Sequence, residues 1–248
     1  MTKTIGIVEA RSADRAGLEK LARKLSGKSL LEWSVRHATD AMRLDGVVVA
    51  ADRDAVDWLR DLVPSDVPMV VGSPRDALNH FAAILKQFPA DAVVRIPGDN
   101  PFLDAALVDR LISTAEMHQG CDYISYHTQT GRWAIHAPLG LLAEWCRADA
   151  LRQADREATE TSDREQVTRF LYSHPERFAA RWIPAPDPLD RHDLRLALVV
   201  EEDWDHAEAI FDALGHDGLD WQRIAGFLAH QPALRERMAE LNRAAAAA

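Results

Sequence analysis

The chain has 248 residues, of which 47% are hydrophobic, so it is long enough to bury the core of one large or two small domains. Its formal net charge of −10, from 29 basic and 39 acidic side chains, argues against a broad basic surface for nucleic acid. No apolar run reaches the about 18 residues of a membrane span, and the N-terminus lacks a signal-peptide cleavage region. Cys121 and Cys146 lack metal-type spacing, which fits a reducing compartment. We therefore expect a soluble cytoplasmic protein that binds neither membranes nor nucleic acid.

Short β-branched segments alternate with helical patterns through the first half of the chain. The strand-like segments are Ile5–Val8, Val47–Ala50, Met69–Val71 and Ala92–Ile96, and the helical patterns are Leu30–Ala41, Asp54–Leu62, Arg75–Gln87 and Ala105–Glu116. Such alternation predicts an α/β fold with a mostly parallel sheet, right-handed crossovers and helices on both faces.

The second half of the chain has a different pattern. Two strands, Asp122–His127 and Trp133–His136, predict an inserted β arm at about residues 122–138. The other expected elements are helices at Leu139–Ala158, Glu165–Tyr172, Asp203–Leu214, Trp221–His230 and Pro232–Asn242, and strands at Arg177–Ile183 and Leu194–Val200. We expect one domain over residues 1–243 and a disordered tail over 244–248.

The strand at Ala92–Ile96 runs into Gly98-Asp99 and then an Asn100-Pro101 turn. Open α/β sheets bind ligands at the carboxyl ends of their strands. Asp99 is therefore a candidate metal ligand for a phosphorylated substrate, and the alternative is an ordinary turn residue. Asp104 is expected to cap the helix that follows it.

The segment from Glu9 to Lys28 follows the first strand and carries repeated cations. They are Arg11, Arg15, Lys20, Arg23, Lys24 and Lys28. Arg and Lys side chains neutralise phosphate charge, so this segment is a candidate triphosphate loop, and the alternative is a solvated basic face. It is not a P-loop, because Ala22 stands where that motif needs glycine. Ser29 is expected to cap the next helix, with Glu32 completing a capping box.

Asp52 and Asp54 have the Asp-x-Asp spacing of many metal-dependent glycosyltransferases. Asp54 is an equally good N-cap for the helical pattern that it begins. Both interpretations stay open from the residues alone.

In their order, these segments resemble the cytidylyltransferases that activate sugars, in the branch typified by spore coat polysaccharide biosynthesis protein F. In the loop after the first strand, Arg11, Lys20, Gly27 and Lys28 match A-R-x-x-S-x-R-L-P-G-K and G-G-K-P-L-L, whereas Arg15 is displaced by one position. Later matches are Val47–Asp52, Gly72–Leu78, Arg95–Pro101, Pro138–Gly140 with Glu144, and Asp163–Thr168. The resemblance covers about Ile5 to Leu214 and implies a Rossmann-like nucleotidyltransferase fold.

The resemblance also implies roles for particular residues. Arg11, Lys20 and Asp99 are the expected catalytic residues, and Asp99 is the expected Mg²⁺ ligand. The expected nucleotide-binding residues are Arg11, Arg15, Lys20, Lys28, Asp52, Gly72 and Arg95. The expected acceptor-binding residues are Gly140, Glu144, Arg164 and Glu165. Transfer of CMP from CTP to a sugar-like acceptor by a homodimer is the implied function.

One departure from the family pattern concerns the metal. Val199 stands where R-x-T-V-D-T-x-E-D supplies a second metal-binding Asp, and Glu201 and Glu202 are the nearby carboxylates that could replace it. Losing one carboxylate weakens a hard-cation site. This motivates an alternative function, in which a catalytically impaired homologue binds a nucleotide, a glycan precursor or a partner. A glycosyltransferase that uses Asp52 and Asp54 is a third interpretation.

Overall fold

The computed structural model describes residues 2–12, 14–73, 75–129, 131, 133 and 137–247. Its main sheet has seven strands in the order β5-β4-β1-β6-β8-β7-β9. In chain order they are β1 (Thr4–Ala10), β4 (Gly46–Asp52), β5 (Met69–Gly72), β6 (Ala92–Pro97), β7 (Tyr123–His127), β8 (Glu144–Arg147) and β9 (Ala180–Pro184). A second, two-stranded sheet pairs β2 (Lys24–Leu25) with β3 (Lys28–Ser29).

All the neighbouring strands of the main sheet run parallel except where β8 is involved. β1 pairs in parallel with β4 and β6, β4 with β5, and β7 with β9, whereas β8 runs antiparallel to β6 and β7. The four β-branched segments of the first half form β1, β4, β5 and β6, so the predicted mostly parallel sheet is confirmed.

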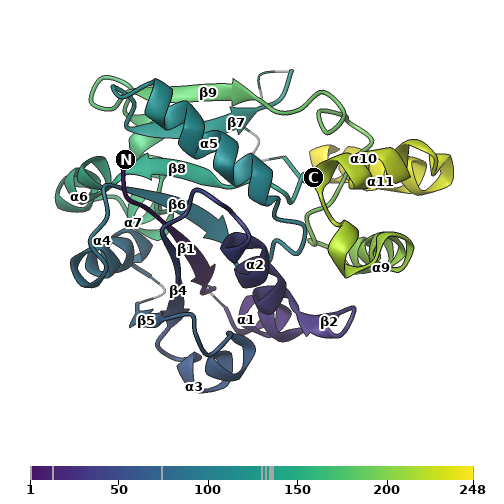
Figure 1. Ribbon diagram of the computed structural model, residues 1–248, viewed down its shortest axis with the longest axis horizontal. Helices are drawn as coiled ribbons and strands as arrows, with labels where there is room; N and C mark the ends of the chain where they lie inside the picture. Colours follow the sequence, from purple (N-terminus) through teal and green to yellow (C-terminus); the bar gives the residue numbers. More distant parts are fainter. Residues whose placement is uncertain are drawn as a thin grey trace.

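Helices cover both faces of the sheet (Figure 1). They are α1 (Arg15–Ala22), α2 (Leu30–Thr39), α3 (Val56–Leu59), α4 (Ala77–Gln87), α5 (Ala105–Met117), α6 (Ala148–Glu157), α7 (Thr161–Glu165), α8 (Arg169–Ser173), α9 (Glu202–Leu214), α10 (Trp221–Ala229) and α11 (Pro232–Ala247). Side chains of α2, α5 and α9 pack in one core with Val8 and Val94, and those of α4, α6 and α8 pack in another with Ile7 and Val93. Alternate residues of β1 and β6 thus face opposite cores, as the period of a strand requires. Among the described residues, no helix has both the length and the low polarity needed to cross a membrane.

Two helix caps that the sequence predicts are present. Ser29 Oγ accepts a hydrogen bond of 3.0 Å from the Glu32 backbone N–H. Asp104 accepts one of 2.9 Å from Leu107 N and one of 2.8 Å from Trp221 N, so it also ties α5 to α10. Asp54 is not a helix cap, because α3 begins after Ala55 and has no side-chain cap.

Several sequence predictions about the second half were wrong. The helix expected at Leu139–Ala158 contains a strand, β8, before α6 begins. Its residues Glu144–Arg147 are not a β-branched run, and the position between β6 and β7 overrides their local preference. The segment Leu194–Val200 is not a strand but an irregular stretch.

The predicted β arm is also different from the structure. Its first strand is β7, which belongs to the main sheet. Of its second strand, residues 134–136 lie outside the described residues, and Trp133 forms one antiparallel bridge with His127. Two further boundaries differ: the helix expected at Glu165–Tyr172 is divided between α7 and α8, and α11 continues to Ala247, through most of the expected tail.

Candidate active site

The loop between β1 and α1 brings a lysine to the end of β6. Asp14 caps α1 by accepting a 2.8 Å hydrogen bond from Gly17 N. Near the end of this helix, Lys20 Nζ lies 2.6 Å from Asp99 Oδ2. Gly98, just before Asp99, permits the close packing of the β6 end against β1, since a Cβ on it would lie 2.2 Å from the backbone oxygen of Glu9. The structure therefore joins two of the predicted catalytic residues, which are 79 positions apart in the sequence.

A small hollow of about 190 Å³ opens beside this pair. Its charged lining residues are Lys20, Asp99, Arg95 and Glu144, and Gly140 is also in its lining. Ala137, Leu142, Ala197, Leu198 and Val199 supply apolar lining. The hollow is therefore lined by both charged and apolar side chains.

A large hollow of about 1030 Å³ is lined in part by α1 and the loop that precedes it. The predicted residues that line it are Arg11, Arg15, Asp52 and Glu165. Sequence reasoning missed Trp58 and Arg75, which also line it, because no motif marks a lone exposed Trp or Arg. Its volume is at the upper end of the usual range for ligand sites, about 300–1,000 Å³.

Beneath the two hollows lies a row of buried charges on one face of the sheet. Glu9 Oε1 accepts a 2.8 Å bond from Arg11, and Glu9 Oε2 lies 2.5 Å from Arg95. Arg95 also donates to Glu144 Oε2 at 2.6 Å. Burial opposes ionisation of Glu9, but the charges of Arg95 and Arg11 outweigh it and hold the pKa of this carboxyl below its ordinary value. Glu9 thus connects an arginine of the large hollow with an arginine of the small one.

Glu144 is the most buried member of this row, with 1% of its side chain exposed. Its Oε1 accepts hydrogen bonds from the hydroxyl of Tyr123 and, at 2.8 Å, from that of Thr168. Burial and the neighbouring charge of Glu144 raise the pKa of Tyr123 well above its ordinary value, so the phenol stays a donor. Sequence reasoning placed Glu144 and Arg95 at the site but missed Glu9, whose position within an apolar strand gave no motif.

Three other residues predicted to bind the nucleotide, Arg15, Lys28 and Asp52, have partners within the protein. Arg15 is 91% exposed and pairs with Glu19 at 2.6 Å, at the rim of the large hollow. Lys28 lies over the ring of Trp33, 4.4 Å from its centroid, and is not among the residues that line either hollow. Asp52 is 3% exposed and its Oδ1 accepts a 2.9 Å bond from Asp54 N, which is the geometry of a turn.

Two glycines of the predicted site permit close packing. A Cβ on Gly72 would lie 2.3 Å from the ring of His80, so Gly72 makes room for a buried histidine that bonds to the backbone of Val70. Gly140 has φ +62°, and a Cβ there would lie 2.5 Å from the backbone of Leu196 and Ala197. Gly140 thus holds the wall of the small hollow together, whereas Gly72 lies outside the residues that line either hollow.

Arg164 and Glu165, predicted on the acceptor side, lie elsewhere. Arg164 bridges Asp76 at 2.8 Å and Asp155 at 2.7 Å, and so ties α7 to α4 and α6. The backbone oxygen of Glu165 accepts a 2.8 Å bond from Arg11, beside the large hollow. Neither is among the residues that line the small hollow.

The position of the missing metal ligand is occupied by an exposed valine. Val199 is 69% exposed and lines the small hollow. Its backbone N–H and that of Val200 donate to Asp203 Oδ2 at 2.8 and 2.9 Å. Asp203 is buried against Arg195 at 2.6 Å, and Glu201 forms two bonds of 2.5 Å with Arg23.

Asp99 is the one predicted metal ligand that lines the small hollow. Its side chain is 39% exposed, and no group of three potential His, Cys, Asp or Glu ligands exists within the described part of the chain. Mg²⁺ is often held by one or two carboxylates together with substrate phosphates and water. The donor set therefore fits a cation that arrives with a phosphate group, and it does not fit a cage made by protein ligands.

Comparison with known proteins agrees with this architecture. Residues 10–177 match the sequence profile of the MobA-like NTP transferase domain. The chain is 28% identical to an uncharacterized protein of Methanocaldococcus jannaschii over 241 residues, 94% of this chain and 93% of the relative. It is 26% identical to the spore coat polysaccharide biosynthesis protein SpsF of Bacillus subtilis over 222 residues, 87% of this chain and 89% of the relative.

Solved structures share the fold at low sequence identity. A cytidylyltransferase of Leptospira borgpetersenii superposes with a TM-score of 0.77 at 16% identity, covering 94% of this chain and 95% of that one. A CMP:2-keto-3-deoxy-manno-octonic acid synthetase complexed with CTP superposes with a TM-score of 0.63 at 12% identity, covering 86% of this chain and 99% of that one. The predicted Rossmann-like nucleotidyltransferase fold is thereby confirmed.

Proposed function

Because the chain belongs to the MobA-like NTP transferase domain family, we propose that it transfers CMP from CTP to a sugar or sugar-like acceptor and releases pyrophosphate. The observation that carries the proposal is the 2.6 Å contact between Lys20 and Asp99 at the end of β6. It supplies a cation and a carboxylate to the small hollow, at the sheet edge where α/β proteins bind ligands. The similarity to SpsF of Bacillus subtilis supports a place in glycan or polysaccharide synthesis.

The large hollow takes CTP in this proposal. Arg11 and Arg15 line this hollow, and Lys20, near the end of α1, reaches the triphosphate from the small hollow. Their charges neutralise the triphosphate and stabilise the negative charge that develops on the leaving pyrophosphate. Glu9 keeps Arg11 oriented through its 2.8 Å bond.

The acceptor enters the small hollow, with its attacking oxygen directed at the α-phosphate. Arg95 and Glu144 are held in fixed positions, because both carboxylate oxygens of Glu144 accept hydrogen bonds. The apolar lining at Leu142 and Leu198 excludes water from the reacting atoms. Catalysis then rests on position and electrostatics, which carry most of the acceleration in such transfers.

A divalent cation, Mg²⁺ in our proposal, would be held by Asp99 and by phosphate oxygens of CTP. When bound, it neutralises phosphate charge and orients the triphosphate. One structural neighbour, of Mycobacterium tuberculosis, is a complex with manganese. Lys20 would exchange its contact with Asp99 for one with phosphate when the nucleotide arrives.

We further propose a single-domain, cytoplasmic homodimer. The family resemblance supports the dimer, and the free thiols of Cys121 and Cys146 are consistent with a reducing compartment. Light scattering coupled to gel filtration measures the mass in solution, and a monomeric mass with and without CTP contradicts the dimer.

Pyrophosphate release tests the function. The purified protein is incubated with CTP, Mg²⁺ or Mn²⁺ and a panel of sugars, and both pyrophosphate and the CMP conjugate are measured. We expect product only when CTP, cation and acceptor are all present. Lys20→Ala is expected to lower the rate of product formation about 10²- to 10³-fold. Lys24→Ala removes an equal charge from an exposed position outside both hollows and should keep the rate.

The second candidate function is binding without turnover, which Val199 favours. Titration calorimetry, together with the pyrophosphate assay, distinguishes a binding module from a transferase. CTP binding that does not depend on the cation, with no pyrophosphate released for any acceptor, supports a binding module. Metal-dependent turnover excludes it.

A further inference from the structure

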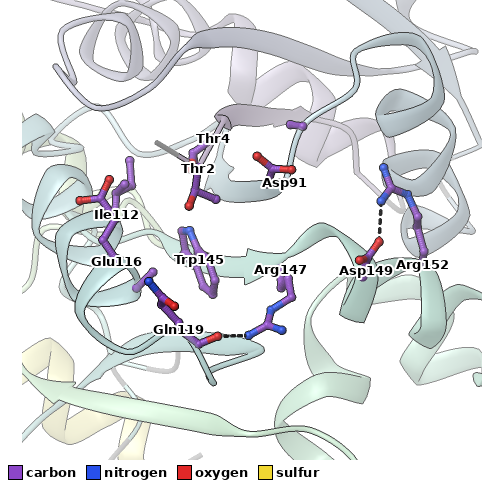
Figure 2. Close-up of a pocket in the computed structure, with 12 residues that line it drawn as sticks. Thr2, Thr4, Asp91, Ile112, Glu116, Gln119, Trp145, Arg147, Asp149 and Arg152 are labelled. Atoms are coloured by element: carbon purple, nitrogen blue, oxygen red, sulfur yellow. Dashed lines mark hydrogen bonds and ion pairs between the residues drawn. The ribbon is translucent and has the colours of Figure 1, made fainter.

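A third cavity lies at the opposite edge of the sheet, where β1 and β6 begin and β8 ends (Figure 2). Its volume is about 660 Å³, and its walls include Thr4 of β1, Trp145 of β8 and Ile112 of α5. Ligand sites usually have about 300–1,000 Å³, whereas one water molecule takes about 30 Å³. The cavity is therefore of ligand size and far larger than one bridging water needs.

Two buried side chains of this cavity have a polar atom without a hydrogen-bond partner among the described residues. They are Trp145, 5% exposed, through Nε1, and Thr4, 1% exposed, through Oγ1. In Figure 2 the nitrogen of Trp145 is directed toward the end of β1 that carries Thr4. Buried polar groups are nearly always bonded, and the indole of Trp33, for comparison, donates to Leu25 O at 2.8 Å. An indole N–H only donates, so the expected occupant offers an acceptor at this point.

The arginines around this cavity are already engaged. Arg147 donates to the backbone oxygens of Gln119 and Cys121 at 2.5 and 2.7 Å, and Arg152 pairs with Asp149 at 2.8 Å. Figure 2 shows two of these contacts. The lining has three carboxylates, Asp91, Glu116 and Asp149, against these two arginines, so the cavity disfavours phosphate and carboxylate groups.

The carboxylates of the lining have acceptor capacity left. Asp91 Oδ2 accepts a 2.8 Å bond from Lys3 N, and Glu116 Oε2 lies 2.7 Å from Arg43, so each of these contacts engages one oxygen of two. A ligand here must donate to carboxylates and accept from an indole. Hydroxyl groups do both.

We propose that this cavity binds an uncharged polyhydroxylated molecule of the size of a mono- or disaccharide. Its hydroxyls accept from Trp145 Nε1, exchange a hydrogen bond with Thr4 and donate to Asp91 and Glu116. Its C–H face packs on Ile112 and the Trp145 ring. Since the cavity is at the opposite edge of the sheet from Asp99, this ligand and CTP can be bound at the same time. The inference does not depend on the proposed function.

The indole N–H resonance of Trp145 tests the proposal directly. The chain has 7 Trp, and the resonance that disappears in Trp145→Phe identifies Trp145. Glucose, N-acetylglucosamine and maltose are titrated into the full-length protein. We expect at least one of them to shift that resonance with saturation. Trp145→Phe, which keeps a ring but lacks the N–H, should bind about fivefold to tenfold more weakly, and Thr4→Val should weaken binding in the same direction. Trp221→Phe, on α10, should keep the affinity.

Three results would overturn the proposal. One is a Trp145 resonance that no sugar moves. Another is a shift of equal size caused by inorganic phosphate or CTP, which would make the cavity an anion site. The third is unchanged sugar affinity in Trp145→Phe and Thr4→Val, each with the thermal midpoint of the wild type, which would place the sugar elsewhere. If Trp145→Phe does not fold, the change of sugar affinity in Thr4→Val decides the matter.

Discussion

Glu9 Oε2 lies 2.5 Å from the guanidinium of Arg95, while the other oxygen of the same carboxylate holds Arg11 at 2.8 Å. One buried carboxylate therefore fixes one arginine at each hollow. The relationship arises from the sheet: Ile7 pairs with Arg95 in the parallel register of β1 and β6, which brings Glu9 next to Arg95 on the same face.

Glu9→Gln removes this shared charge and keeps the shape of the side chain. We expect the free energy of unfolding to fall by about 2–3 kcal/mol, because charge-assisted bonds to two buried arginines are weakened. We also expect KM to rise for CTP and for the acceptor together. Urea unfolding and steady-state kinetics measure both effects. Glu32→Gln is the matched control, since its pair with Arg36 is exposed and should contribute under about 0.5 kcal/mol. A change in only one KM would contradict the shared role.

Lys20→Ala tests the cation next to Asp99. We expect kcat to fall about 10²- to 10³-fold, the usual loss when one preorganised donor to developing charge is removed. Lys20→Arg should recover little, because a planar fork does not replace a compact ammonium at a contact of 2.6 Å. Single-turnover formation of the CMP conjugate is the measurement. Activity within about twofold of the wild type in Lys20→Ala would exclude the catalytic role.

Val199→Asp adds a carboxylate to the small hollow. Val199 is 69% exposed, so the change should alter the unfolding midpoint little. We expect the Mg²⁺ concentration for half-maximal activity to fall, because a second carboxylate strengthens a hard-cation site. Asp99→Asn should raise that concentration, and the double variant should lie between them. If Val199→Asp leaves the metal dependence unchanged, the cation does not bind beside Val199.

Gly140→Ala tests the wall of the small hollow. At φ +62° and 2.5 Å from the backbone of Leu196, a Cβ costs about 1–3 kcal/mol of folding free energy. We expect a lower thermal midpoint and a higher acceptor KM with little change for CTP. Gly120→Ala is the control, since a Cβ on Gly120 would meet no atom of the described residues within 4 Å. Equal midpoints for the two variants would contradict the packing argument.

Acid sensitivity follows in part from two histidines, His80, which is buried, and His37, which is partly buried. Burial lowers the pKa of each below its ordinary value of 6.5, so the folded state binds fewer protons than the unfolded state. Their contribution to stability is present above pH 6.5 and is lost as pH falls through the folded-state values. We expect the urea midpoint to decrease from pH 7 toward pH 5, and NMR titration to give both histidines values below 6.5. A value above 6.5 for either would be the opposite of what burial predicts.

The loop residues show where prediction of the site was limited. The local pattern placed Arg11 and Asp99 after strands of the parallel sheet, at the edge where such sheets bind ligands, and the family resemblance added Lys20, which contacts Asp99. The sequence did not distinguish the cations that line a hollow from Lys28, which lies over Trp33, or from Arg164, which ties three helices together. A cation in a loop has the same local signature whether it meets a phosphate or an aromatic ring, so only the packed neighbours distinguish the two.

Hydrophobic periodicity and capping residues by themselves determined β1, β4, β5 and β6, the helices α2, α3 and α4 between them, and the position of Asp99 at a strand end, whereas α1 lies in the segment predicted to be a loop. These features depend on neighbours close in the chain, which is why the sequence contains them. The tertiary structure alone decided that Glu144–Arg147 is an antiparallel strand, that Glu9 joins Arg11 to Arg95, and that Asp203 and Glu201 are bound to arginines beside Val199. Those contacts join residues distant in sequence, and their energies depend on burial and on partners that local pattern does not specify.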